Sequence, residues 1–231
     1  MKLIATILLA FFCIVSPVQA ASAVVPTVAV QGSSQVEAIP DQAQINLGVV
    51  TTGKTAEEAQ LENSVLVNAV QANLFAMGLA ESKLQTTQYA VYPIQSEAKD
   101  QKTPQIIGYR VSHTLTVTAD DLSKIGALID NALAAGANQI LGISFKKRDD
   151  TQLKTQALQE AVKEATAKAE AIVAASGKKL GRIVSMQENG VSIHLPEFTQ
   201  RYMLKADGVS TPIMPGSIRV NGAVSIVFEI N

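Results

Sequence analysis

The side chains that most often perform catalysis or bind metals are scarce in this sequence. His113 and His194 are the only two histidines, and they lie in different halves of the chain. A structural or catalytic zinc site needs three or four ligands at regular spacing, and no such pattern surrounds either histidine. We therefore predict no metal-ligating residues and expect both histidines to have structural or solvated positions.

The other chemical patterns have simpler explanations. Asp149 and Asp150 could form a cation site, but they directly precede a helical pattern, where capping is the expected role. The adjoining basic run Lys146–Arg148 is neutralised locally by these carboxylates, and an anion contact is the alternative interpretation. The sequence contains neither a G-x-S-x-G nucleophile motif nor a glycine pattern for nucleotides. We expect no catalytic residue and no cofactor.

The first twenty residues have the pattern of a secretion signal. Lys2 precedes the apolar run Leu3–Val15, and the segment ends at the small residue Ala20. The run is shorter than the ~20 residues that span a bilayer, so we expect cleavage after Ala20 and a periplasmic protein without a transmembrane segment. The only cysteine, Cys13, lies in this signal. The mature chain, residues 21–231, then has neither a disulfide nor a reactive thiol.

The charge balance of the mature chain limits its partners. Of 19 basic residues only Lys2 lies in the signal, which leaves 18 basic against 20 acidic residues. This balance argues against nucleic acid as a partner.

Alternating and helical patterns predict ten elements that would position these side chains. Thr55 and Glu58 form a capping box that begins a helix. Asp120 is expected to cap the next helix, which Gly136 ends. Six strands are predicted at 27–37, 42–51, 84–96, 106–119, 140–147 and 180–188, and a seventh at 217–230.

The longest element is a helix over Thr151–Gly177. Its apolar stripe is rich in alanine, including Ala157, Ala161, Ala165 and Ala169. Small side chains allow close approach, so we expect this helix to pack on a β-sheet.

The element order ββαββαβαββ predicts an α+β fold with antiparallel sheets covered by helices. Pro40-Asp41 suggests a turn, so the first two strands are expected to form a hairpin. Two lobes are predicted, at 27–119 and 120–231.

Several short motifs occur in a consistent order along the chain. They are Val28–Gly32, Pro40-Asp41, Asn63, Tyr92-Pro93, Gly108–Val111, Asp121-Leu122, Gly136–Asn138, Leu180-Gly181 and Pro215-Gly216. In this order the sequence resembles the SIMPL-domain family of bacterial periplasmic proteins. The resemblance implies a mixed α/β fold and a periplasmic or envelope location. It also implies a link to oxidative-stress defence and the capacity to form a homo-oligomer, and it supplies no catalytic residues.

Residues 189–216 are predicted to form a long irregular loop, and such loops are often functional. Five apolar side chains make it the candidate interaction loop: Phe198, Tyr202, Met203, Ile213 and Met214. We therefore expect a non-enzymatic protein that acts by self-assembly or by binding an envelope component. The alternative is an enzyme of unrecognised class, with a cleft between the lobes near Tyr109, Arg110 and His113.

Overall fold

The computed structural model describes residues 25–96, 104–195 and 213–231, so the predicted signal segment 1–20 lies outside it. The element order is the predicted ββαββαβαββ, with two additional 3-10 turns at Glu81–Lys83 and Leu122–Lys124. The elements are β1 (Thr27–Ala38), β2 (Gln42–Gly53), α1 (Ala56–Ala76), β3 (Leu84–Gln95), β4 (Ile106–Ala119), α2 (Ile125–Ala135), β5 (Gln139–Lys146), α3 (Thr151–Ala175), β6 (Leu180–His194) and β7 (Ile218–Ile230).

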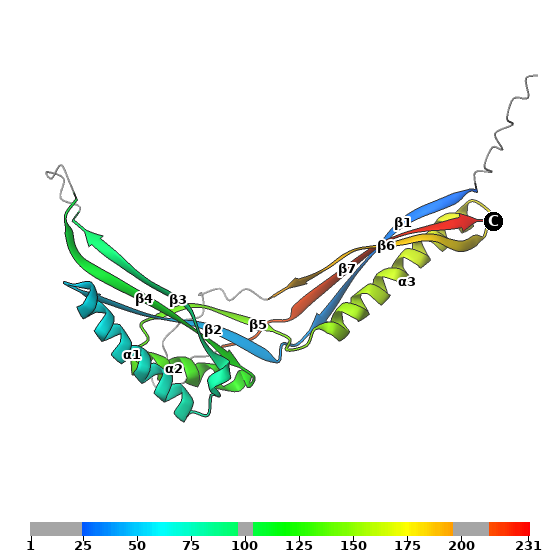
Figure 1. The fold of residues 1–231 in the computed structure, drawn as a ribbon. Coiled ribbons are helices and arrows are strands. Elements are labelled where there is room, and N and C mark those ends of the chain that lie inside the picture. Colours follow the sequence, from blue (N-terminus) through cyan, green and yellow to red (C-terminus); the bar gives the residue numbers. More distant parts are fainter. Residues whose placement is uncertain (1–24, 97–103, 196–212) are drawn as a thin grey trace, which may run out of the picture.

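The strands form two antiparallel sheets, which confirms the predicted α+β class. One sheet has the order β3-β4-β2-β5 and the other β1-β7-β6. Figure 1 shows an elongated, bent molecule in which α1 and α2 cover the first sheet and α3 covers the second. We call these units the first lobe and the second lobe.

The predicted hairpin of β1 and β2 is wrong, because the two strands belong to different sheets. β1 pairs along its whole length with β7, from Thr27 opposite Glu229 to Ala38 opposite Ile218. The short segment 39–41 therefore crosses between the lobes instead of reversing the chain. The sheets divide the chain near residues 39–41 and 147–150, and not at the predicted boundary between 119 and 120.

Capping side chains begin the helical segments of the first lobe. Thr55 begins α1 as predicted, because its hydroxyl accepts the Glu58 N–H at 3.1 Å. Asp121, and not the predicted Asp120, caps the turn before α2 by accepting the Ser123 N–H.

Large aliphatic and aromatic side chains fill the core of the first lobe. The buried residues include Ile45, Leu47, Val49, Val70, Leu74, Leu115, Val117, Ile125, Ile129 and Phe145.

The second lobe depends on small residues, as the alanine-rich stripe predicts. The four alanines at positions 157, 161, 165 and 169 are fully buried. A Cβ on Gly32 of β1 would overlap the Ala161 carbonyl oxygen, and one on Gly222 of β7 would lie 2.8 Å from the Ala157 carbonyl oxygen. The helix therefore lies close to the sheet because both surfaces lack side chains at the contact.

Strand β6 is longer than predicted. It continues to His194, so the first six residues of the predicted loop, 189–194, belong to the sheet. The pairing with β7 shifts between Glu188 and Gly190, and Gly190 has a φ of 110°. A β-bulge absorbs the Asn189-Gly190 pair, so this turn-like dipeptide bends the strand without ending it.

Candidate functional site

The predicted interaction loop is only partly described. Phe198, Tyr202 and Met203 lie outside the described residues. Ile213 is partly buried against the core of the first lobe, whereas Met214 is 87% exposed. Of these two residues, Met214 alone has the accessibility that a contact residue needs.

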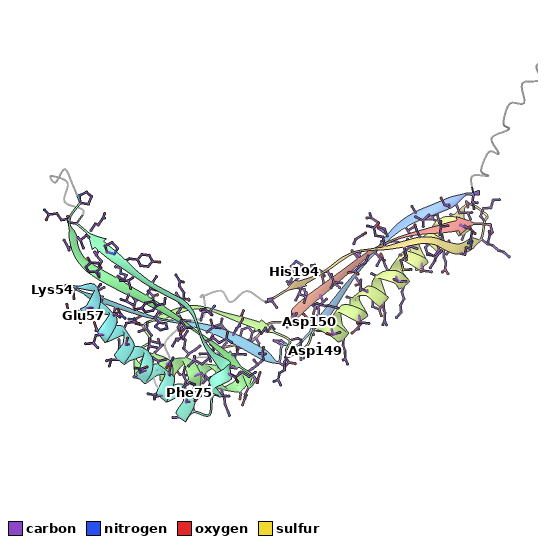
Figure 2. The ribbon with its side chains drawn as sticks, viewed as in Figure 1. Lys54, Glu57, Phe75, Asp149, Asp150 and His194 are labelled. Atoms are coloured by element: carbon purple, nitrogen blue, oxygen red, sulfur yellow. The ribbon has the colours of Figure 1, made fainter. Side chains whose placement is uncertain are left out.

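The two histidines lie in separate surroundings. In β4, the His113 ring lies 2.9 Å from the Thr86 hydroxyl, and its centroid is 5.3 Å from that of Tyr89 in an edge-on arrangement. Burial lowers the pKa of His113 below its usual value. His194, at the end of β6 (Figure 2), contacts the Asn221 amide at 3.2 Å. No group of three or more potential metal ligands occurs in the part of the chain that the structure describes.

The charged residues at the lobe junction bind one another. The Asp41 carboxylate accepts the Arg148 N–H at 2.8 Å and pairs with Lys147 at 3.1 Å. The backbone hydrogen bond from Arg148 is the main reason that the pKa of Asp41 is lowered. Arg148 also pairs with Asp120 at 3.1 Å. These contacts join the two connections between the lobes and pair two of the three cations of the basic run, Lys147 and Arg148, with carboxylates.

The neighbouring carboxylates, Asp149 and Asp150, make structural contacts at the start of α3. Asp149 accepts the Thr151 N–H at 2.9 Å at the start of α3, which lowers its pKa, with the Thr151 side chain as the largest cause. Asp150 pairs with Lys154 at 2.9 Å. Both lie at the junction of the lobes (Figure 2).

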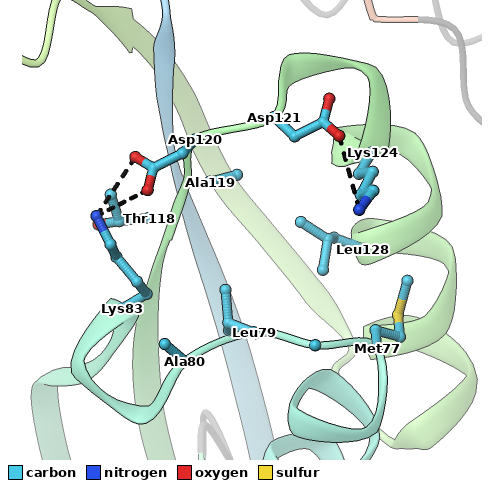
Figure 3. A pocket seen from close by; sticks show the side chains of 11 residues that line it. Met77, Leu79, Ala80, Lys83, Thr118, Ala119, Asp120, Asp121, Lys124 and Leu128 are labelled. Atoms are coloured by element: carbon cyan, nitrogen blue, oxygen red, sulfur yellow. Dashed lines mark hydrogen bonds and ion pairs between the residues drawn. The ribbon is translucent and has the colours of Figure 1, made fainter.

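A hollow of about 230 Å³ lies between the end of β4, α2 and the turn before β3 (Figure 3). Lys83 pairs with Asp120 at 3.0 Å, and Lys124 pairs with Asp121 at 3.7 Å. The pKa of Asp120 is lowered, chiefly by the hydrogen bond that the Gln42 amide donates. Both carboxylates of this hollow are therefore paired with cations.

The expected enzyme cleft has no counterpart in this hollow or in the two described next. Tyr109, Arg110 and His113 line none of the three. One of the others is a shallow depression of about 580 Å³ across β1, β7 and β6, lined by small and amide side chains. It contains no charged residue that could act on a substrate.

The third hollow, of about 410 Å³, is apolar and lies on one flank of α3. Leu158, Val162 and Lys163 are among its lining residues. Glu164, two residues after Val162, accepts the Ser33 N–H of β1 at 2.9 Å. Successive helical residues turn by about 100°, so Val162 points to the opposite flank, toward β6.

Strand β6 extends this surface with apolar side chains and with the carboxylate of Glu188, which is paired with the buried Val224. Ile183 is paired with Phe228 and Met186 with Ile226, and both partners are buried beneath α3. Directly paired residues share a face of the sheet, so Ile183 and Met186 face the side that α3 covers. They remain 47% and 49% exposed because α3 packs mainly on β1 and β7. We name Leu158, Val162, Lys163, Ile183 and Met186 the α3–β6 groove.

Sequence reasoning missed this groove, because neither of the two sequence patterns that contribute to it could reveal it. Leu158 and Val162 belong to the predicted stripe of α3, but the buried stripe is narrower than the sequence pattern and runs through the alanines. The alternating pattern identified β6 as a strand, but it could not show that α3 would leave one face of β6 uncovered.

A second exposed apolar surface lies on the solvent side of α1. Leu61 is 68% exposed and Val65 is 61% exposed. Asn68 and Ala72, also exposed, continue the row at steps of three and four. We name these four residues the α1 outer face.

The model of the SIMPL family, described as a protein of unknown function (DUF541), matches residues 28–228. The chain belongs to the SIMPL family. It is 32% identical over 210 residues to the 26 kDa periplasmic immunogenic protein of Brucella melitensis, covering 88% of this chain and 84% of the relative. It is 26% identical over 209 residues to the uncharacterized protein YggE of Escherichia coli K12, covering 89% and 83%.

The family match confirms the resemblance drawn from the ordered motifs. Some of these motif residues have visible structural roles in this SIMPL chain. Asn63 is buried and donates to the Val49 carbonyl at 2.9 Å, and Asn138 bonds both the N–H and the C=O of Val50. No helix among the described residues is long and apolar enough to cross a membrane.

Proposed function

We propose that this SIMPL-family protein is a non-enzymatic periplasmic protein that acts by self-assembly, with binding of an envelope component as the other form of the same activity. The observation that carries the proposal is the α3–β6 groove, whose apolar side chains stay half-exposed beside a covered sheet. Contiguous apolar surface on a folded protein commonly marks an interaction site.

Two further points support this proposal. The secretion-signal pattern in residues 1–20 and the periplasmic name of the Brucella relative favour export to the periplasm. The ionisable groups gathered at the lobe junction and in the neighbouring hollow are paired with one another. A site for acid–base catalysis would need at least one group free to exchange a proton with a substrate.

Light scattering after size exclusion, over a range of protein concentrations, tests the proposal. We expect the mass to exceed that of one chain, and the double variant Ile183→Ser/Met186→Ser to reduce it. Leu141→Ser is the matched control, because Leu141 is 54% exposed on β5 in the other lobe. Circular dichroism checks that each variant is folded.

The envelope-binding form is separated in the same experiment. If the protein is a single chain at every concentration yet sediments with isolated envelope fragments, and the double variant does not, the groove binds an envelope component. If the protein neither assembles nor sediments with envelope fragments, the proposal is wrong.

Oxidative-stress defence is a further part of the proposal that depends on exposed methionines. Met186 is 49% exposed and Met214 87% exposed, and exposed thioethers are oxidised to sulfoxides that can be repaired. A strain that lacks the protein should become more sensitive to hypochlorite, and the Met186→Leu/Met214→Leu variant should restore resistance less well than the unaltered chain. Equal resistance in all three strains would remove this part.

A further inference from the structure

We infer that the open edge of strand β6 binds an extended polypeptide segment of another protein, in which apolar and polar residues alternate and a basic residue lies on the apolar side. The inference rests on the envelope-binding form of the proposed function and names the chemistry of the component that is bound. β6 is the last strand of the sheet β1-β7-β6 (Figure 1). The bound segment would add a strand to this sheet beside the α3–β6 groove.

Of the four edge strands in the two sheets, β6 is the least protected in the part of the chain that the structure describes. At the opposite edge of its sheet, Lys168 and Glu164 bond the backbone of β1. In the first lobe, β3 contains Pro93, which has no N–H, and β5 is only 8 residues long. β6 is 15 residues long and contains no proline, and no described side chain bonds its backbone. Such an edge can accept a further strand.

The bonds at β1 show which backbone groups of β6 point to the open edge. The N–H and C=O of a residue in a strand point to the same neighbour, and successive residues point to opposite neighbours. Ser33 points away from β7, because an α3 carboxylate accepts its N–H. Gly32 therefore points toward β7, and its partner Val224 points toward β1. Glu188 lies opposite Val224 and Met186 lies two residues before it, so the N–H and C=O groups of both point to the open edge.

The side chains around these groups specify the two faces of the partner. An added strand lies about 4.8 Å beyond β6. Its side chains on the α3 side would pack against Ile183 and Met186, which are 47% and 49% exposed. On the other side of β6, the exposed residues Ser185, Gln187 and Ser192 are polar. The partner therefore needs apolar residues on one face and polar residues on the other, which is the alternation of a strand with one covered face.

Glu188 adds a requirement for charge. It is exposed on the α3 side of the sheet, and no salt bridge to it occurs among the described residues. Opposite charges on neighbouring strands stabilise their pairing, and like charges oppose it. A second copy paired through the middle of its own β6 would bring two Glu188 carboxylates close together. A basic residue in a different segment makes a favourable pair instead.

The register of β6 places the contact. Its pairing with β7 is uninterrupted over residues 185–188 and shifts between Glu188 and Gly190. A β-bulge bends a strand and hinders the addition of another. The segment therefore pairs with residues 185–188, next to the groove.

Hydrogen exchange on the intact chain tests the backbone pairing. The probe is a synthetic peptide of about six residues that alternates valine with threonine and has a lysine in place of one valine. At a peptide concentration of about ten times its Kd, the Met186 and Glu188 amides should exchange about tenfold more slowly. The Gln187 amide, which points toward β7, should keep its rate.

A methylated peptide is the matched control. N-methylation of its valines and lysine keeps the side chains but removes the N–H groups that would face β6. This peptide should protect neither amide. Equal protection by both peptides would show that apolar adhesion, and not strand pairing, holds the peptide, and would contradict the inference.

A change of charge tests the required basic residue. A peptide with glutamate in place of lysine should bind about fivefold more weakly, and Glu188→Lys should reverse this preference. Glu57→Lys, at an exposed position of α1 in the other lobe, makes the same change of charge and should leave the preference unaltered. Equal affinity of the two peptides for the unaltered chain would contradict the charge requirement.

The outcomes separate this inference from the proposed function. If the protein assembles or sediments with envelope fragments but the peptide protects neither amide, the inference fails alone. If both amides are protected without peptide and lose this protection on dilution, a second copy occupies the edge and the inference is wrong. If the protein neither assembles nor sediments with envelope fragments, the proposed function fails, whatever the peptide shows.

Discussion

The two lobes cover their sheets in different ways. In the first lobe, α1 and α2 lie side by side on a four-stranded sheet, and large aliphatic residues fill the space between the layers. In the second lobe, the single helix α3 lies on a three-stranded sheet through a row of alanines. An alanine row brings the helix closer but covers a narrower strip of sheet. The strand farthest from the helix, β6, therefore keeps apolar side chains in solvent.

The largest loss of stability is expected from a cavity in the core of the first lobe. Leu115 is fully buried in its core, so Leu115→Ala leaves a cavity and should lower the free energy of unfolding by about 2–5 kcal/mol. Chemical denaturation measures this loss. Val91→Ala, at a position 40% exposed on β3, is the control, and an equal loss there would mean that the core does not depend on large side chains.

The next largest loss of stability is expected where α3 packs closely on the sheet of the second lobe. Ala161 is fully buried above Gly32, so Ala161→Trp must push α3 away from the sheet. We expect a loss of about 1–3 kcal/mol or more from overpacking. Ala167→Trp, at an exposed position of the same helix, provides the comparison. Unchanged melting of Ala161→Trp would show that this face of α3 is not packed on the sheet.

A smaller effect sharpens the comparison at the strand edges. In the first lobe the Asn138 side chain, just before the start of β5, bonds the Val50 N–H at 2.9 Å and the Val50 C=O at 2.7 Å. Asn138→Ala should cost about 1–2 kcal/mol. Hydrogen exchange should show faster exchange at the Val50 amide, while amides of β1 keep their rates. Unaltered exchange at Val50 would show that the amide bond to Asn138 does not protect this edge.

In the second lobe, two residues of α3 bond the backbone at the open edge of the sheet. Lys168 donates to the Gln31 carbonyl at 3.1 Å and Glu164 accepts the Ser33 N–H. These are the outward backbone groups of edge strand β1, which a further strand would otherwise use. Both lobes therefore use side chains to occupy open edges, one with a single amide and the other with an ion pair.

The smallest expected effect concerns the junction between the lobes. The pKa of Asp41 lies below its ordinary value of 3.8, chiefly because of the Arg148 N–H. A lowered pKa means that the ionised carboxylate stabilises the folded state above the ordinary pKa, and that this contribution is lost as the pH falls through the folded-state value. Asp41→Asn should therefore destabilise the protein slightly at neutral pH and much less at acid pH. Denaturation at several pH values measures the difference, and a difference that grows on acidification would contradict this account.

The sequence predicted the elements well because their signals are local. Thr55, the alanines of α3 and the alternating residues of β4 each act within a few residues, and all three predictions are confirmed. The predicted hairpin of β1 failed because the same alternation would suit any partner strand. Its actual partner, β7, lies about 190 residues away, and no local pattern specifies that distance.

The candidate site was harder to predict for the same reason. The interaction loop was chosen from composition, yet Ile213 packs against the first lobe. The α3–β6 groove arises from what α3 fails to cover, and this depends on how three distant segments meet. Leu158 and Ile183 look like ordinary core residues until the position of the helix on the sheet is known.

The pairing of β1 with β7 also determines the order in which the chain can fold. The first lobe, from β2 to β5, is one continuous segment inserted between β1 and α3, so all its strands are available as soon as β5 has been made. The second lobe has its first strand near one end of the chain and its central strand near the other. Long-range pairing of this kind is slow because a long loop must close first. We expect β1 to remain without its partner until the last strand, β7, has been made.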